Sequence, residues 1–106
     1  MGKLVYGNGS RSFEIEDRTL AHLRVVFMNK LRRGESFMFH HTEPHLTCSV
    51  WMDPSVPFIL QFHGSRQPTV NRDWVEALMQ EASSANGLRV VPEPAPGTAV
   101  LADAVG

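Results

Sequence analysis

The sequence predicts an α+β fold, in which an antiparallel sheet of five or six short strands carries two helices packed on one of its faces. Several short runs alternate between apolar and polar residues, and this alternation is typical of strands with one buried face. Two longer segments place apolar residues three or four positions apart, which is typical of helices. The links between consecutive strands are short, and short links favour antiparallel pairing. The expected order is β-β-α-β-β-β-α, with an optional final β.

The first two strands are expected to form a hairpin. Lys3–Tyr6 and Ser12–Glu16 are the strand-like runs, and residues 7–10 (Gly-Asn-Gly-Ser) separate them. The Asn-Gly pair favours a tight hairpin turn, because both residues tolerate positive φ.

The segment Asp17–Arg33 is predicted to form the first helix, with Asp17 as its N-cap and Gly34 just after its end. Its apolar positions fall in one stripe, which we expect to face the sheet: Leu20, Leu23, Phe27 and Leu31. His22 falls on the opposite side of this helix, so it is expected to be exposed. Phe27 is expected to meet an inward-facing phenylalanine of the strands: Phe13, Phe37 or Phe62.

Three further strands are predicted after the first helix, and prolines interrupt the chain between them. Their ranges are Glu35–His41, Leu46–Met52 and Phe58–His63. The second helix is predicted to begin after Asn71, whose side chain is a suitable N-cap, and to end at Gly87. Leu88–Val91 is the optional final strand.

The length of 106 residues fits one domain, which we place at residues 1–92. Residues 93–106 are rich in Pro and Ala and poor in large apolar side chains, so we predict a disordered tail. The net charge is −1 at pH 7. Any affinity for nucleic acid must therefore come from uneven placement of charge.

The single cysteine bears on the compartment in which the protein works. Because Cys48 is the only one, no disulfide can form within the chain, and a lone thiol suits a reducing compartment. No stretch approaches the ~20 apolar residues of a membrane span. The N-terminus has no apolar run of signal-peptide length. We therefore expect a cytoplasmic protein with no membrane contact.

Motifs for nucleotide chemistry are missing from the sequence. A P-loop needs Gly-Lys-Ser/Thr, but Lys3 and Lys30 are each followed by Leu. No Gly-x-Gly-x-x-Gly opens a helix, and no Gly-x-Ser-x-Gly elbow presents a serine nucleophile. We expect no cofactor, and we assign no catalytic residue.

The residues 40–45 form the best candidate for a metal site. In an extended chain the side chains of His41, Glu43 and His45 would face one way, and three such ligands can hold zinc or another divalent ion. Pro44, however, indicates a turn within the cluster. We favour the alternative, an exposed polar loop that binds no metal.

Cys48 has two interpretations. A thiol beside a histidine can act as a nucleophile. Cys48, however, falls on the apolar side of its strand, and a free cysteine there is usually a small buried hydrophobic residue. We favour the second interpretation.

The first helix carries half of the positive charge of the chain. Five of the ten Lys and Arg lie on it, with no acidic residue among them: Arg18, Arg24, Lys30, Arg32 and Arg33. Such a helix can neutralise nucleic-acid phosphates. It can equally be a solvated face whose last cations complement the helix dipole, and we favour this simpler interpretation.

Trp51 is an unusual aromatic residue, because it falls on the polar side of its strand. Aromatic side chains are enriched at protein interfaces. We therefore expect Trp51 either to cap the edge of the sheet or to mark a contact surface on a partly open sheet face, together with Ile59.

Several segments resemble a family of small actinobacterial proteins of unknown function. The segments that carry the resemblance are Asp17–Leu23, Lys30–Phe37, Pro54–Pro57 and Asn71–Leu78, and the likeness extends over residues 1–94. Members of this family often carry the name ATP-dependent DNA ligase. That name implies a Lys-x-Asp-Gly motif whose lysine forms the adenylate. Neither Lys3 nor Lys30 is followed by such a sequence.

These observations lead to three hypotheses about function. The leading one is a small non-enzymatic binding module that acts through protein contacts, with a protein partner or a second copy of the chain. The second is a nucleic-acid-associated accessory protein that uses the basic helix, residues 18–33. DNA ligase activity is the least favoured. The candidate contact residues for a partner or a nucleic acid are Arg24, Lys30, Arg32, Arg33 and Trp51.

Overall fold

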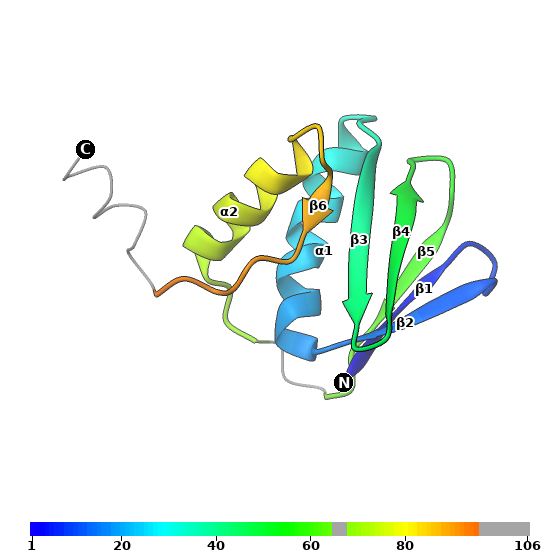
Figure 1. The fold of residues 1–106 in the computed structure, drawn as a ribbon, viewed down its shortest axis with the longest axis horizontal. Coiled ribbons are helices and arrows are strands. Elements are labelled where there is room, and N and C mark those ends of the chain that lie inside the picture. Colours follow the sequence, from blue (N-terminus) through cyan, green and yellow to red (C-terminus); the bar gives the residue numbers. More distant parts are fainter. Residues whose placement is uncertain (65–67, 96–106) are drawn as a thin grey trace.

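The computed structural model describes residues 1–64 and 68–95, and this part of the chain forms six strands and two helices (Figure 1). In chain order they are β1 (Gly2–Tyr6), β2 (Arg11–Ile15), α1 (Asp17–Arg32), β3 (Phe37–Glu43), β4 (Leu46–Met52), β5 (Phe58–Gln61), α2 (Arg72–Ala82) and β6 (Leu88–Arg89). The α+β class and the predicted order of elements are confirmed, including the final strand. Neither helix among the described residues is long and apolar enough to cross a lipid bilayer.

The strands divide between two three-stranded sheets, ordered β2-β1-β5 and β4-β3-β6. The sequence had suggested one sheet, because β5 follows β4 closely along the chain. The connection between them contains Pro54 and Pro57, and it carries β5 away from β4 to an antiparallel position beside β1. β6 pairs with β3 in parallel, which requires a crossover, and α2 lies in the chain between them.

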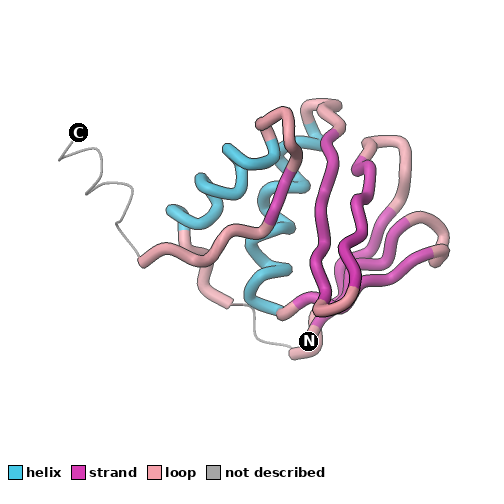
Figure 2. The backbone as a smooth tube through the Cα atoms, in the orientation of Figure 1, coloured by secondary structure: helices cyan, strands magenta, loops and turns pink. Residues whose placement is uncertain are grey.

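The two sheets and α1 enclose one hydrophobic core. Phe27 of α1 is fully buried near its centre. Its ring lies 5.6 Å from that of Phe37, 5.5 Å from that of Phe39 and 5.8 Å from that of Phe58, measured between ring centroids. The expected contact between Phe27 and Phe37 is confirmed. The helices gather at one side of the molecule and the β1–β2 hairpin at the other (Figure 2).

The prediction that His22 is exposed is wrong, because its side chain is fully buried. Helical periodicity locates the side of α1 that faces the sheets, but it does not reveal that α2 covers a second side. His22 Nδ1 donates to the carbonyl oxygen of Arg18 at 2.7 Å, and Nε2 accepts from the main-chain N–H of Asn71 at 2.8 Å. The Trp74 ring lies 4.5 Å away, between centroids. His22 thus holds α2 against α1.

The start of α2 follows the sequence prediction. Asn71 Oδ1 accepts hydrogen bonds from the main-chain N–H groups of Asp73 and Trp74, so Asn71 is the N-cap. The helix ends at Ala82, five residues before the expected terminator Gly87. Gly87 instead forms the turn into β6 with φ of 88°, where a Cβ atom would lie 2.8 Å from the carbonyl oxygen of Met38.

The chain after β6 packs along the start of α2. Val91 accepts a hydrogen bond from the Trp74 indole at 2.9 Å. The Glu93 carboxylate binds the Arg18 guanidinium through two hydrogen bonds, of 2.6 and 2.8 Å, and accepts a third from Asn71 Nδ2 at 3.0 Å. Glu93, which we had assigned to a disordered tail, is therefore held by α1 and α2. Residues 96–106 of the predicted tail lie outside the described part of the chain.

Candidate functional site

Among the described residues, β4 is an edge strand, since its only neighbour in the sheet is β3. In an antiparallel pair, alternate residues direct both main-chain groups toward the neighbouring strand, and the residues between them direct both away. The carbonyl oxygen of Trp51 accepts a hydrogen bond from the Tyr6 hydroxyl, so it points away from β3. Thr47 and Ser49, at alternate positions, therefore also point their N–H and C=O groups to the open side.

These groups of Thr47 and Ser49 have no hydrogen-bond partner among the described residues. β4 also contains no charged residue and no proline along its seven residues. Charges and prolines are the usual means by which edge strands avoid pairing with another chain. The open side of β4 therefore has unpaired main-chain groups and neither of these protections.

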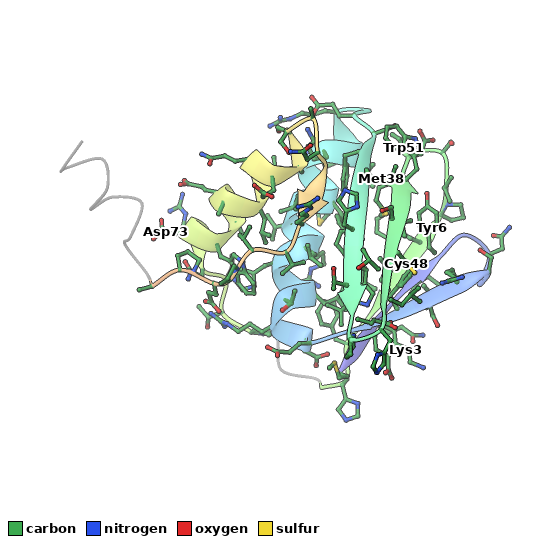
Figure 3. All side chains as sticks on the ribbon, viewed as in Figure 1. Lys3, Tyr6, Met38, Cys48, Trp51 and Asp73 are labelled. Atoms are coloured by element: carbon green, nitrogen blue, oxygen red, sulfur yellow. The ribbon has the colours of Figure 1, made fainter. Side chains whose placement is uncertain are left out.

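A groove of about 490 Å³ runs beside this open side. It separates β4 from the β1–β2 hairpin and is lined by Tyr6, Arg11, Phe13, Cys48, Ser49, Val50 and Trp51. Tyr6, Cys48 and Trp51 all lie in the part of the molecule that is beyond β3 from both helices (Figure 3). We call this combination of strand edge and groove the β4 edge site.

Arg11 supplies the positive charge of the β4 edge site. Its Nη2 donates a hydrogen bond to Cys48 Sγ at 3.2 Å, and its guanidinium carbon lies 5.8 Å from the centre of the Phe13 ring. Arg11 is the first residue of β2 and pairs across the hairpin with Tyr6. The hairpin therefore places Arg11 beside the groove, where its guanidinium contacts Cys48 and Phe13.

Tyr6 and Trp51 close one end of the site. Burial, together with the nearby carboxylate of Asp53, raises the pKa of the Tyr6 hydroxyl above its ordinary value of 10.0, so the group stays protonated and remains a donor. The Trp51 ring stands on the outer side of β4 and is 53% exposed, as predicted, and Leu46 at the other end is 51% exposed. Ile59 is also exposed, but it belongs to the other sheet. Trp51 and Ile59 therefore do not share one open face.

The candidate metal ligands do not come together as a set. His41 Nε2 lies 3.3 Å from Glu43 Oε1, without the alignment of a hydrogen bond, and this nitrogen is buried. His45 occupies the turn between β3 and β4. No group of three His, Cys, Asp or Glu with suitable geometry for a metal exists among residues 1–64 and 68–95.

Cys48 is half-buried on the inner side of β4, and its neighbours decide between the two interpretations given above. His41 lies directly opposite on β3, so a histidine is adjacent. No hydrogen bond joins the two side chains within the described structure, and the thiol instead accepts a hydrogen bond from Arg11 Nη2. Cys48 therefore lacks the thiol–imidazole hydrogen bond of an activated nucleophile.

A second depression, of about 590 Å³, lies where β2 leads into α1. It is lined by both acidic and basic groups, among them Glu14, Glu16, His41 and Arg89. Among the described residues, His41 Nε2 is the one buried side-chain nitrogen or oxygen without a hydrogen-bond partner, and His41 lines this depression. This mixture of charges selects no particular ligand.

The basic side chains of α1 do not form one continuous positive surface. Lys30 is buried, and its Nζ donates a hydrogen bond to Glu35 Oε1 at 2.9 Å. This hydrogen bond lowers the pKa of Glu35. Arg18 is held by Glu93. Arg24 lies over the Phe62 ring at 5.0 Å from its centre. Arg32 and Arg33 are exposed at the end of the helix.

Sequence reasoning found Trp51 but missed Tyr6, Arg11 and the main chain of β4. A signal was present, since a seven-residue strand without charge or proline is an unprotected edge wherever it lies at the side of a sheet. The sequence did not show that β4 lies at the side of its sheet, because that location depends on β5 pairing in the other sheet.

Comparison with known proteins gives one match. No curated protein and no solved structure is similar enough to match the chain. A family model described as a domain of unknown function, DUF7882, matches residues 1–93, which run from the first strand to the Glu93 that binds Arg18. The chain therefore belongs to the DUF7882 family.

Proposed function

We propose that this domain is a protein-binding module that captures an extended segment of a partner by adding it as a strand to β4. The observation that carries the proposal is the pair of unpartnered main-chain sites at Thr47 and Ser49 on an uncharged edge strand. Strand addition is an established mode of peptide recognition, in which main-chain hydrogen bonds supply affinity and side-chain pockets supply specificity.

The groove beside β4 supports the proposal. Side chains of a strand alternate between its two faces. On an added strand, every second side chain would enter the groove against Phe13 and Val50, and the others would lie on the outer face beside Trp51. The site therefore offers both main-chain partners and a place for the side chains on each face.

The nucleic-acid hypothesis receives less support. Two of the basic side chains of α1 are neutralised by glutamates outside the helix. Glu93 pairs with Arg18, and Glu35 pairs with Lys30. The exposed pair Arg32 and Arg33 is a small footprint for phosphate binding. DNA ligase activity stays the least favoured, because no Lys-x-Asp-Gly is present to form an adenylate.

A proline substitution tests the proposal. Thr47→Pro removes one outward N–H from β4 and leaves the hydrogen bonds to β3 in place. Thr47→Val keeps this N–H and serves as the matched control. A displayed library of short random peptides is selected against each protein, after thermal melts have shown that each is folded. We expect enrichment with the native chain and with Thr47→Val, and none with Thr47→Pro.

Amide chemical shifts give a second measurement on the unmodified protein. A selected peptide should shift the main-chain N–H signals of Thr47 and Ser49 and the indole signal of Trp51. The same N–H groups should become protected from hydrogen exchange. Shifts confined to the outer surface of α1 and α2, or enrichment that survives Thr47→Pro, would contradict strand addition at β4.

A further inference from the structure

We infer that Arg11 selects the partner of β4: an extended segment from a different protein that places an Asp or Glu side chain in the groove beside Cys48. This inference rests on the proposed strand addition and names the chemistry of the added strand. It follows from the surroundings of the guanidinium, from the alternation of strand side chains and from the symmetry of self-pairing.

Within the part of the chain that the structure describes, the guanidinium of Arg11 is the one charged group in the lining of the groove. Among the described residues, its polar partner is the Cys48 sulfur, which is a weak acceptor. No carboxylate among the described residues lies within ion-pair distance of Arg11. Several of its five N–H donors thus remain for a ligand, and a carboxylate matches their planar geometry.

The position of Arg11 sets the place of this carboxylate on the added strand. Cys48 and Val50 face inward from β4, and Arg11 approaches from the opposite wall at the level of Cys48. A side chain opposite Cys48 on the added strand would point into the groove and reach the guanidinium. The side chain two positions along would meet Phe13 and Val50, which favour an apolar group. The recognised pattern is therefore one acidic and one apolar residue, separated by one position.

The same arginine disfavours a second copy of this chain as the occupant. Two copies of β4 could pair antiparallel through a twofold axis at Ser49. Cys48 would then lie one residue from this axis in each copy. Each Cys48 carries its own Arg11, so two guanidinium groups would be brought together without a carboxylate between them. Like charges at a strand pairing are destabilising and exclude unwanted partners.

Charge exchange at Arg11 tests the inference. The probes are three strand-forming peptides of alternating Thr and Val that carry Glu, Gln or Lys at one inward position. Binding is measured in two ways. A bound peptide should reduce the access of a fluorescence quencher to Trp51, and it should slow the alkylation of Cys48. With the native chain we expect the Glu peptide to bind about tenfold more tightly than the Gln peptide, and the Lys peptide to bind weakest. The preference should shrink at high salt.

Two variants give the decisive comparison. Arg11→Gln should make the three affinities nearly equal, and Arg11→Glu should reverse their order in favour of the Lys peptide. If all three peptides bind and neither variant changes their order, strand addition stands and the role of Arg11 is refuted. If the native chain binds none of them, and sedimentation shows a dimer that Thr47→Pro dissociates, the occupant is a second copy and both proposals are refuted.

Discussion

The Nε2 atom of His22 accepts a hydrogen bond from the main-chain N–H of Asn71 at 2.8 Å, and this bond joins the first turns of α1 to the start of α2. The other ring nitrogen donates to the carbonyl oxygen of Arg18, so both polar atoms of this buried ring are paired. The arrangement requires a neutral ring with its proton on Nδ1, because a carbonyl oxygen can only accept.

Replacing His22 should therefore destabilise the fold. His22→Ala leaves a cavity and a buried Asn71 N–H without a partner, and we expect a loss of about 2–4 kcal/mol in the free energy of unfolding. Arg33→Ala, at the exposed end of α1, is the control and should change it by less than about 0.5 kcal/mol. Urea melts measure both. Equal losses in the two variants would show that the His22 bonds are not important for stability.

Phe27→Ala should cost about 3–5 kcal/mol of unfolding free energy, because the ring is fully buried among Phe37, Phe39 and Phe58. The next residue provides a control. Met28 is 52% exposed, so Met28→Ala should be close to neutral. Denaturant melts with unchanged slopes would establish that both variants keep the same native state. A cost for Phe27→Ala similar to that for Met28→Ala would contradict the packing described here.

The carboxylate of Glu93 should make stability depend on acidic pH. Hydrogen bonds from Arg18, and then from Asn71, lower its pKa from the ordinary 4.5 to about 2. Because the folded-state value is the lower one, the stabilisation is complete above about pH 4.5 and is lost as the pH falls toward 2. Thermal melts should show a difference between the native chain and Glu93→Gln that is present at neutral pH and shrinks over this range.

The Arg18→Gln background checks the cause of the Glu93 effect. If the guanidinium is the main source of the stabilisation, Glu93→Gln should then have a smaller effect at neutral pH. A pH-independent difference between the native chain and Glu93→Gln would indicate that lost packing, rather than charge, is responsible.

Binding of duplex DNA should be weak and sensitive to salt. Two of the basic side chains on α1 are paired with glutamates, and Arg32 and Arg33 offer few phosphate contacts. Titration of a labelled duplex should give a dissociation constant no tighter than about 10⁻⁶ M at physiological salt. Tight binding that Arg32→Ala with Arg33→Ala abolishes would favour the nucleic-acid hypothesis instead.

Local patterns in the sequence were sufficient for the elements and their order. The Asn71 cap, the apolar stripe around Phe27 and the alternation in β3 and β4 each depend on neighbours in the chain. The burial of His22 depends on a residue 49 positions away, and the pairing of Arg18 on one 75 positions away. Periodicity carries no information about such contacts, so both basic and polar positions of α1 were assigned to solvent.

The division into two sheets escaped prediction for a related reason. Alternation shows which side of a strand is buried, but it does not name the strand beside it. β5 could pair with β4 or with β1 on pattern alone, and its pairing with β1 is what leaves the edge of β4 open. The candidate site is therefore a property of topology more than of any motif.

The parallel pairing of β6 with β3 has a consequence for synthesis on the ribosome. Leu88 of β6 is fully buried in the core and lies near the C-terminal end of the domain that the family model matches. Its partner Phe39 on β3 is synthesised much earlier. A nascent chain emerges N-terminal end first, so β3 cannot pair with β6 until nearly the whole domain has been translated. The hairpin β1–β2 and the pair β3–β4 can form earlier, and the docking of β6 and Glu93 is expected to be the step that completes the native state.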